Sequence, residues 1–185
     1  TDGTNAWSDF WILKLNSDGT KVWDKTYGGN WFDIAYSIQQ TSDGGYIVAG
    51  FTDDITDWDN GVRDIWILKL NSDGTKAWDK TYGGSGSEYA NSIQQTNDGG
   101  YIVAGGTSSS DGDITDGNND GSDFCLLKLK PDGTKEWDKT YGGSGIEYAN
   151  SIQQTSDGGY IVAGRTDSND GDITDGNNGI YDMWI

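Results

Sequence analysis

The sequence of 185 residues contains no histidine, one cysteine, one proline and only three glutamates. Without histidine the chain lacks the usual general base of Ser-His or Cys-His catalysis and the commonest transition-metal ligand, so hydrolysis by that route is excluded. Cys125 permits no internal disulfide. Only 12 basic residues face 30 acidic ones, and the formal net charge of −18 repels phosphate backbones, so we expect no nucleic-acid partner. Apolar runs such as residues 10–13 are too short for a membrane span, so we expect no membrane insertion.

Turn-forming residues dominate the composition that is present. The chain has 29 glycines, and 27 of its 30 acidic residues are aspartate rather than glutamate. Aspartate and glycine favour tight turns, whereas the apolar spacings of three and four residues that indicate helices are missing. Nine tryptophans and ten tyrosines supply large apolar area for burial. We therefore predict an all-β fold.

Three copies of one unit make up the chain. The segment WILKLNSDGTKVWDKTYGG starts at Trp11 and returns, with changes, from Trp66 and Cys125, and its opening returns at Trp184. The steps are 55, 59 and 59 residues. A second segment, SIQQTSDGGYIVAG, starts at residue 37 and returns, nearly unchanged, from residues 92 and 151. Repetition at such a period is typical of architectures in which each unit packs against the next.

Each unit contains four predicted strands separated by turn signals. In the middle copy they lie at residues 90–96, 100–107, 123–129 and 135–141. The third strand is apolar on both faces and needs cover on both sides, whereas the fourth carries lysines typical of an outer edge. The first strand, with Gln39 and Gln40 in the first copy, is polar enough to line a wet interior. A four-stranded antiparallel sheet that is apolar on both faces and repeats about every 40 to 60 residues is typical of a β-propeller blade.

The predicted array has about three blades. Residues 1–33 supply the two C-terminal strands of one blade, residues 34–84 and 85–143 form blades, and residues 144–185 form a partial blade. Three blades cannot close into a ring, because propellers typically need about four to eight. Other copies of the chain or further repeats of it must then complete the array. A two-sheet sandwich is the alternative fold, but it does not require near-identical repeats.

These segments, together with DGDITDGNN at residues 111–119 and 170–178, resemble the delta-60 or DUF5122-type β-propeller repeats of large bacterial and archaeal surface or secreted proteins. The resemblance covers essentially the whole chain. The turn at residues 41–45 also resembles the Asp-box hairpin of sialidase-like propellers, although Val48 stands where that motif has an aromatic residue. The family resemblance implies a propeller fold and an extracellular or cell-surface location, and it assigns no activity.

Features that recur in every unit are interpreted as structural. The Tyr-Gly-Gly corners that begin at residues 27, 82 and 141 are expected to place glycine at positive φ where the chain crosses between blades. Trp23, Trp78 and Trp137 are expected to pack between blades rather than to bind sugar. Cys125 occupies the position of a tryptophan in the other copies, so it is interpreted as a packing residue and not as a nucleophile.

The acidic loop that precedes the third strand of the middle copy predicts a calcium site. Residues 116–121 match D-x-[DN]-x-[DN]-G, the opening of a calcium loop that presents alternate oxygens and then turns on glycine. Leu127 stands where an EF-hand has its twelfth-position glutamate, so neighbouring carboxylates would have to close the site. The alternative is an Asx-rich turn in solvent. Calcium is the predicted cofactor, and its predicted ligands are Asp111, Asp113, Asp116, Asn118, Asp120 and Asp123.

Two hypotheses of function, from different classes, follow. The first is an extracellular or cell-surface structural protein without catalytic groups, which self-assembles through open blade edges and whose partners are other copies or further repeats. The second is a glycan- or ligand-binding module that uses the non-repeated aromatic residues Trp31, Phe32 and Trp58. An enzyme is not expected, and glycosidase chemistry by two opposed carboxylates is the third alternative.

Overall fold

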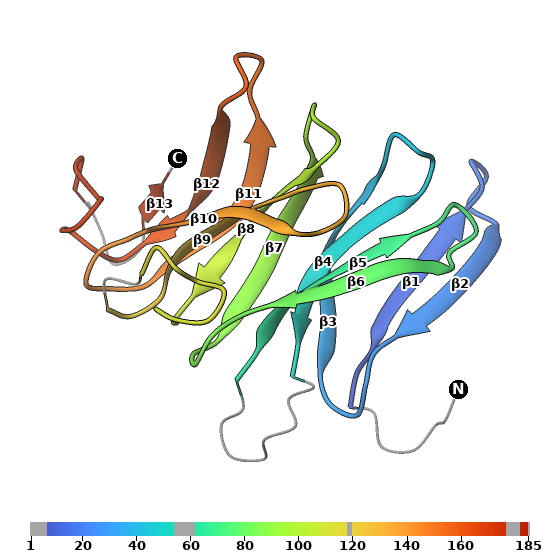
Figure 1. The fold of residues 1–185 in the computed structure, drawn as a ribbon, viewed down its shortest axis with the longest axis horizontal. Coiled ribbons are helices and arrows are strands. Elements are labelled where there is room, and N and C mark those ends of the chain that lie inside the picture. The colour runs from blue at the N-terminus through green and yellow to red at the C-terminus, as the bar shows by residue number, and fades with distance from the viewer. Residues whose placement is uncertain (1–6, 54–61, 118–119, 177–181, 185) are drawn as a thin grey trace.

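The computed structural model describes residues 7–53, 62–117, 120–176 and 182–184. These residues form thirteen β-strands and no helix, which confirms the predicted all-β class. The strands build four antiparallel sheets that stand side by side in chain order (Figure 1). The hairpin of β1 and β2 and the sheet that contains β13 lie at opposite sides of this row, and the described sheets do not close into a ring (Figure 1). No helix in the described ranges is long and apolar enough to span a membrane.

The four sheets correspond to the repeated units. The N-terminal hairpin pairs β1 (Phe10–Leu15) with β2 (Lys21–Tyr27). The first blade has the strand order β3 (Asp33–Gln40), β4 (Tyr46–Thr52), β5 (Asp64–Leu70) and β6 (Lys76–Tyr82). The second blade repeats this order with β7 (Glu88–Gln95), β8 (Tyr101–Thr107), β9 (Asp123–Leu129) and β10 (Lys135–Tyr141). The partial blade contains β11 (Glu147–Gln154), β12 (Tyr160–Thr166) and β13 (Asp182–Trp184).

Strand positions in the second blade agree with the sequence-based prediction. The third and fourth strands have the predicted bounds, and the first two differ from prediction by one or two residues at their ends. The sandwich alternative is wrong, because the structure has a row of small sheets rather than two large ones facing each other. The described sheets therefore have the arrangement of consecutive propeller blades.

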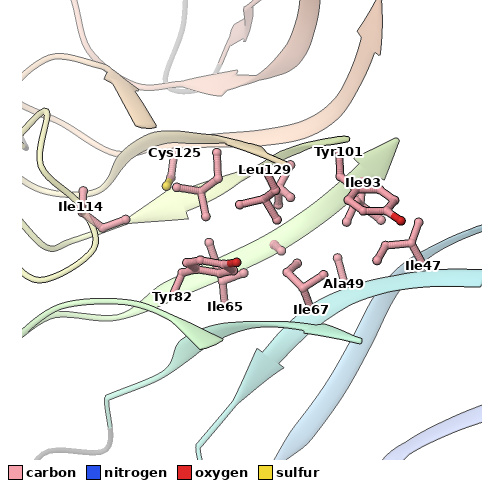
Figure 2. Packing of buried hydrophobic residues seen from close by; sticks show 13 residues of the cluster. Ile47, Ala49, Ile65, Ile67, Tyr82, Ile93, Tyr101, Ile114, Cys125 and Leu129 are labelled. Carbon is pink, nitrogen blue, oxygen red and sulfur yellow. The ribbon is translucent and has the colours of Figure 1, made fainter. Parts of the chain in front are cut away.

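The apolar core lies between sheets. Ile65 and Ile67 of the first blade pack in one cluster with Cys125 and Leu129 of the second blade (Figure 2). A similar cluster joins the N-terminal hairpin to the first blade, and another joins the second blade to the partial blade. Cys125 is fully buried, which confirms its interpretation as a packing residue, and burial raises the pKa of its thiol. Each blade thus shares its buried clusters with a neighbour, as expected for units that cannot cover their own faces.

The burial of a strand depends on its place in the blade. In β5 all residues from Ile65 to Leu70 are buried, and in β9 all seven are. The outer strand β6 is mostly exposed, as its lysines predict. In the two complete blades the third strand is therefore covered on both sides and the fourth forms the outer edge, as predicted.

A buried lysine in the third strand fastens the turn between the first two strands. The Lys69 ammonium lies 2.9 Å from Asp43, and in the second blade the Lys128 ammonium lies 2.8 Å from Asp98. Hydrogen bonds from Lys128 and Thr96 lower the pKa of Asp98 to about 2. Because the lysine ammonium is buried and the carboxylate is its counter-ion, removal of the aspartate would leave a costly buried charge. The repeated turn therefore depends on contacts within each blade as well as on its glycines.

The structure contradicts the expectation that the glycines of the Tyr-Gly-Gly corners adopt positive φ. None of their glycines in the described residues has positive φ. At Gly83 an added Cβ would collide with Asp64 Oδ1 and lie 2.9 Å from Glu88 Oε2. Burial raises the pKa of both carboxyl groups, Asp64 and Glu88. Glycine is required at this corner because two carboxyl groups pack against its Cα, and not because the backbone adopts a left-handed conformation.

Candidate functional site

A pair of aromatic residues holds each sheet to the next. Trp78 of β6 meets Tyr101 of β8 edge to face, with 6.0 Å between ring centroids. The same pair occurs between the N-terminal hairpin and the first blade at 5.8 Å, and between the second blade and the partial blade at 5.9 Å. Such a pair contributes about 0.5–1.5 kcal/mol beyond its buried area. The prediction that the repeated tryptophans pack between blades is confirmed.

A tyrosine of the outer strand forms a second repeated contact. The Tyr82 hydroxyl donates a hydrogen bond to the carbonyl of Gly133, which lies in the β9–β10 turn of the next blade. Gly133 has φ +81°, and an added Cβ would lie 2.9 Å from the Trp78 ring. Tyr27 and Gly74 repeat this bond one blade earlier. The outer strands of the N-terminal hairpin and of the first blade are therefore each tied to the outer turn of the next blade.

Glutamine side chains join the inner strands of neighbouring sheets by hydrogen bonds. The backbone N–H of Gln95 donates to Gln39 Oε1 at 2.6 Å, and that of Gln154 donates to Gln94 Oε1 at 2.7 Å. In the opposite direction, the N–H of Ser42 donates to Gln95 Oε1 at 2.8 Å. These amides thus bind the backbone of the neighbouring blade, and the adjacent strands β3, β7 and β11 form a continuous inner row.

The partial blade exposes residues that its sister copies bury. Ile47 and Ile102 occupy the same position of the second strand and are fully buried, whereas their counterpart Ile161 is 49% exposed. Tyr82 is buried, and its counterpart Tyr141 is 39% exposed. These residues border an apolar groove of 450 Å³ lined by Phe124, Leu126, Trp137, Tyr141, Tyr160, Ile161 and Val162. We call this surface the C-terminal face.

The N-terminal hairpin leaves a second such surface open. Leu13 of β1 is 40% exposed, although its counterparts Leu68 and Leu127 are fully buried. Trp11 is 64% exposed against 8% for Trp66. A groove of 220 Å³ lies between β1 and β3 on this surface. We call it the N-terminal face, and define it by the exposed apolar residues Trp11, Leu13, Leu15 and Ile38.

The strand pairing at the two ends is complementary. In the second blade, β8 pairs with β9 along its whole length from Tyr101 to Thr107. In the partial blade, β13 pairs only with the last three residues of β12. The N-terminal hairpin supplies copies of the third and fourth strands, and within the described residues no inner pair belongs to it. One end of the array thus has the strands that the other end lacks.

The predicted calcium ligands that the structure describes contact different partners. Asp111 Oδ1 accepts a hydrogen bond from Ser85 N–H at 2.7 Å, and Asp113 Oδ2 accepts one from Gly83 N–H at 3.4 Å. Asp116 binds the Lys139 ammonium at 2.6 Å, which lowers the pKa of its carboxyl group. Asp123 is buried at the start of β9, and Asp120 has φ 98°. The described ranges contain no group of three or more acidic, histidine or cysteine side chains placed to hold a metal. Asn118 lies outside these ranges, and the calcium site stays a prediction.

The predicted ligand-binding aromatics are partly described. Trp31 and Phe32 are half-buried in the connection between the N-terminal hairpin and the first blade. Phe32 packs against Trp7, with 5.4 Å between ring centroids, and Trp7 is 67% exposed. Trp58 lies outside the described residues. The structure therefore adds Trp7 to an aromatic group that sequence reasoning placed at Trp31 and Phe32.

The stacked four-stranded sheets and their shared clusters define a propeller-type repeat protein. Residues 41–76 match the family described as a domain of unknown function (DUF5122) beta-propeller. This segment contains the β3–β4 turn, β4, β5 and the start of β6 in the first blade, and the other copies repeat its strands. The match over this one segment agrees with the propeller-type arrangement of the repeated sheets. No curated protein matches the chain.

Proposed function

We propose that the chain is a structural and interaction protein of the cell exterior that assembles by stacking blade on blade. The C-terminal face and the N-terminal face are the surfaces that stack. Either another copy of the chain or a further repeat covers them, with the same contacts that join the blades within the chain. No catalytic activity is proposed.

One observation carries this proposal: equivalent residues are buried at internal junctions and exposed at the two ends. Ile161 has the sequence surroundings of Ile102, and Leu13 has those of Leu68, so each end retains the apolar surface of an internal junction. Burial of a side chain of this size contributes about 1.5–3 kcal/mol. The open edge of β12 and the outer strand pair of the N-terminal hairpin add matching backbone groups. The family resemblance supports the exterior location.

The oligomeric state of the 185-residue chain tests the assembly. We expect size-exclusion chromatography with light scattering to give masses above that of the 20.0 kDa monomer at micromolar concentration. Because each copy carries a net charge of −18, added salt should screen repulsion and increase the mass. Antibody labelling of intact cells that make the protein tests the location.

Charge placed on either end face should prevent the assembly. We expect Leu13→Lys and Ile161→Lys each to shift the chain toward the monomer. Ser72→Lys adds the same charge in the exposed β5–β6 turn and serves as the matched control, because it lies on neither face. A monomer at all concentrations and salt conditions, or equal effects of all three variants, would contradict the proposal.

The second candidate function is glycan binding by the aromatic group of Trp7, Trp31 and Phe32. The exposed Trp7 beside Phe32 favours it, because an aromatic ring open to solvent can stack on a sugar. A glycan array probed with the wild type and with Trp31→Ala tests it. Signals that Trp31→Ala removes would support glycan binding, and no signal from either protein would leave this candidate without support.

A further inference from the structure

Both arginines of the chain border one groove. Arg63 precedes β5 and Arg165 lies in β12, yet both line an open groove of 380 Å³. Three tyrosines also line it, namely Tyr36, Tyr89 and Tyr148. The groove runs across β3, β7 and β11, where the inner strands of the three consecutive sheets meet. Its volume is near the lower end of the roughly 300–1,000 Å³ range of small-molecule sites.

A β-bulge on each inner strand places a polar or aromatic side chain in this groove. The register of the pairing shifts between Ala35 and Ser37, and at the equivalent positions of β7 and β11. The bulged residues are Tyr36, Asn91 and Asn150, and all three line the groove. Bulges commonly redirect a side chain next to a functional site. The bulge thus recurs on all three inner strands, and it presents a tyrosine in the first and an asparagine in the other two.

The second strand also varies only beside this groove. The three copies read YIVAGFT, YIVAGGT and YIVAGRT, so they differ at one position, occupied by Phe51, Gly106 and Arg165. Arg165 lines the groove, and an added Cβ on Gly106 would lie 2.9 Å from the Tyr148 ring. Six of the seven positions of this strand are the same in all three copies, and the one variable position lies beside the groove. We interpret this variation as a feature of the groove rather than of the repeat.

The guanidinium groups lie on aromatic rings. Arg63 Cζ is 4.7 Å from the centroid of Phe51 and 5.5 Å from that of Tyr89. Arg165 Cζ is 4.8 Å from the centroid of Tyr148. Arg63 also donates hydrogen bonds to Asp53 and to the Tyr89 hydroxyl, both at 3.1 Å. Arg63 is therefore held in place before any ligand arrives, which lowers the entropic cost of binding.

The side chains that line the groove are basic, whereas the molecule is acidic. Two arginines and no carboxylate line the groove, and Asp53, which pairs with Arg63, is not among the lining residues of this chain of net charge −18. Guanidinium groups bind carboxylates in a planar, bidentate way, tyrosine rings stack on flat apolar faces, and asparagine amides bond to hydroxyl groups. A short sugar that carries carboxylates offers all three kinds of group, namely carboxylates, flat ring faces and hydroxyls. A long phosphate polymer would be repelled by the surrounding acidic surface.

We propose that this groove binds an acidic oligosaccharide, with Arg63 and Arg165 on the carboxylates and the tyrosines on the sugar rings. The site is separate from Trp31 and Phe32, and it does not require the assembly proposed above, because one chain supplies all of its lining residues. A bound oligosaccharide would bridge three consecutive sheets. Ligand binding would thus also stabilise their stacking.

Calorimetric titration of the full chain with tetragalacturonic acid tests the proposal. We expect saturable binding that weakens with added salt, and no binding of the methyl ester of the same tetrasaccharide, which keeps the rings but loses the charge. Arg165→Gln should weaken binding about tenfold or more. Lys80→Gln is the matched control on the exposed face of β6 and should change the affinity less than about twofold.

Arg63→Gln is the second variant of the binding experiment. Thermal unfolding of each variant establishes that the variant is folded. Arg165→Gln should remain folded, because the sister strands carry Phe51 and Gly106 at this position. Equal binding of the acid and its ester, no binding of the acid at millimolar concentration, or unchanged affinity of Arg165→Gln would overturn the proposal. Tighter binding of a penta-glutamate peptide than of the tetrasaccharide would overturn the choice of ligand.

Discussion

Replacement of Trp78 by alanine should weaken the junction between the two complete blades and cost more stability than Trp137→Ala. Trp78 packs against Tyr101 on one side, and Gly133 of the next blade lies against its ring. Trp137 forms the same pair with Tyr160, but within the described residues no turn of a following blade lies against it. The two variants remove the same side chain from a complete and from an incomplete junction.

The magnitude follows from burial and from ring contact. Truncation of a fully buried large aromatic residue costs about 3–5 kcal/mol. Trp78 is half-buried, so we expect about 2 kcal/mol from lost burial and about 1 kcal/mol from the lost ring pair. For Trp137 we expect about half of this total, because one side of its ring has no partner blade.

Equilibrium unfolding in urea, followed by circular dichroism and fluorescence, measures both costs. Loss of the central contact should also lower the dependence of unfolding free energy on urea, because the blades then unfold less cooperatively. An unchanged midpoint for Trp78→Ala, or an equal or larger loss for Trp137→Ala, would refute the conclusion that stability resides between the sheets.

Three further predictions concern single positions. Burial of Asp138 opposes its ionisation, but its bonds to Lys135 and Thr115 prevail and lower its pKa to about 2. Because the pKa in the folded state is below the ordinary value of 3.8, stability on the order of 2 kcal/mol should be lost as pH falls from about 5 to 2. Asp138→Asn should flatten this loss in urea unfolding at a series of pH values, and an identical acid dependence would contradict it. Gly83→Ala should cost about 2–3 kcal/mol by overpacking against two carboxyl groups, whereas Gly19→Ala, at φ +83° in open space, should cost about 1 kcal/mol of backbone strain; equal costs in the same assay would argue against the steric explanation of the corner. Calcium at millimolar concentration should raise the melting temperature above that in chelator if the acidic loop binds it, and equal melting temperatures would remove this prediction.

The strands could be predicted from the sequence because the pattern of each strand recurs in the three copies of the unit. Cys125, for example, could be interpreted as a packing residue since tryptophan holds its place in other copies, and its complete burial agrees. The location of the core also followed, because the strand that contains Ile65 and Ile67 is apolar on both faces.

Contacts between residues distant in sequence could not be predicted in the same way. The reason for glycine at Gly83 lies in two carboxyl groups that approach it in the folded state, and no local pattern reveals them. The bonds of Gln39 and Gln94 to the next blade depend on the register between sheets. The groove lined by Arg63 and Arg165 was not predicted either. The sequence does contain an indication of it, because Arg165 stands at the one variable position of an otherwise constant strand.

The shared clusters also have a consequence for how such a chain can change in length. Because every junction uses the same pair of a tryptophan and a tyrosine, loss of one whole unit would again bring Trp23 to a tyrosine equivalent to Tyr46. Gain of a unit would likewise create one more junction of the existing kind. Unequal recombination between repeats could therefore lengthen or shorten the protein in whole steps and keep this pair at each junction, whereas a change of a few residues within a strand would shift its register and expose its buried face.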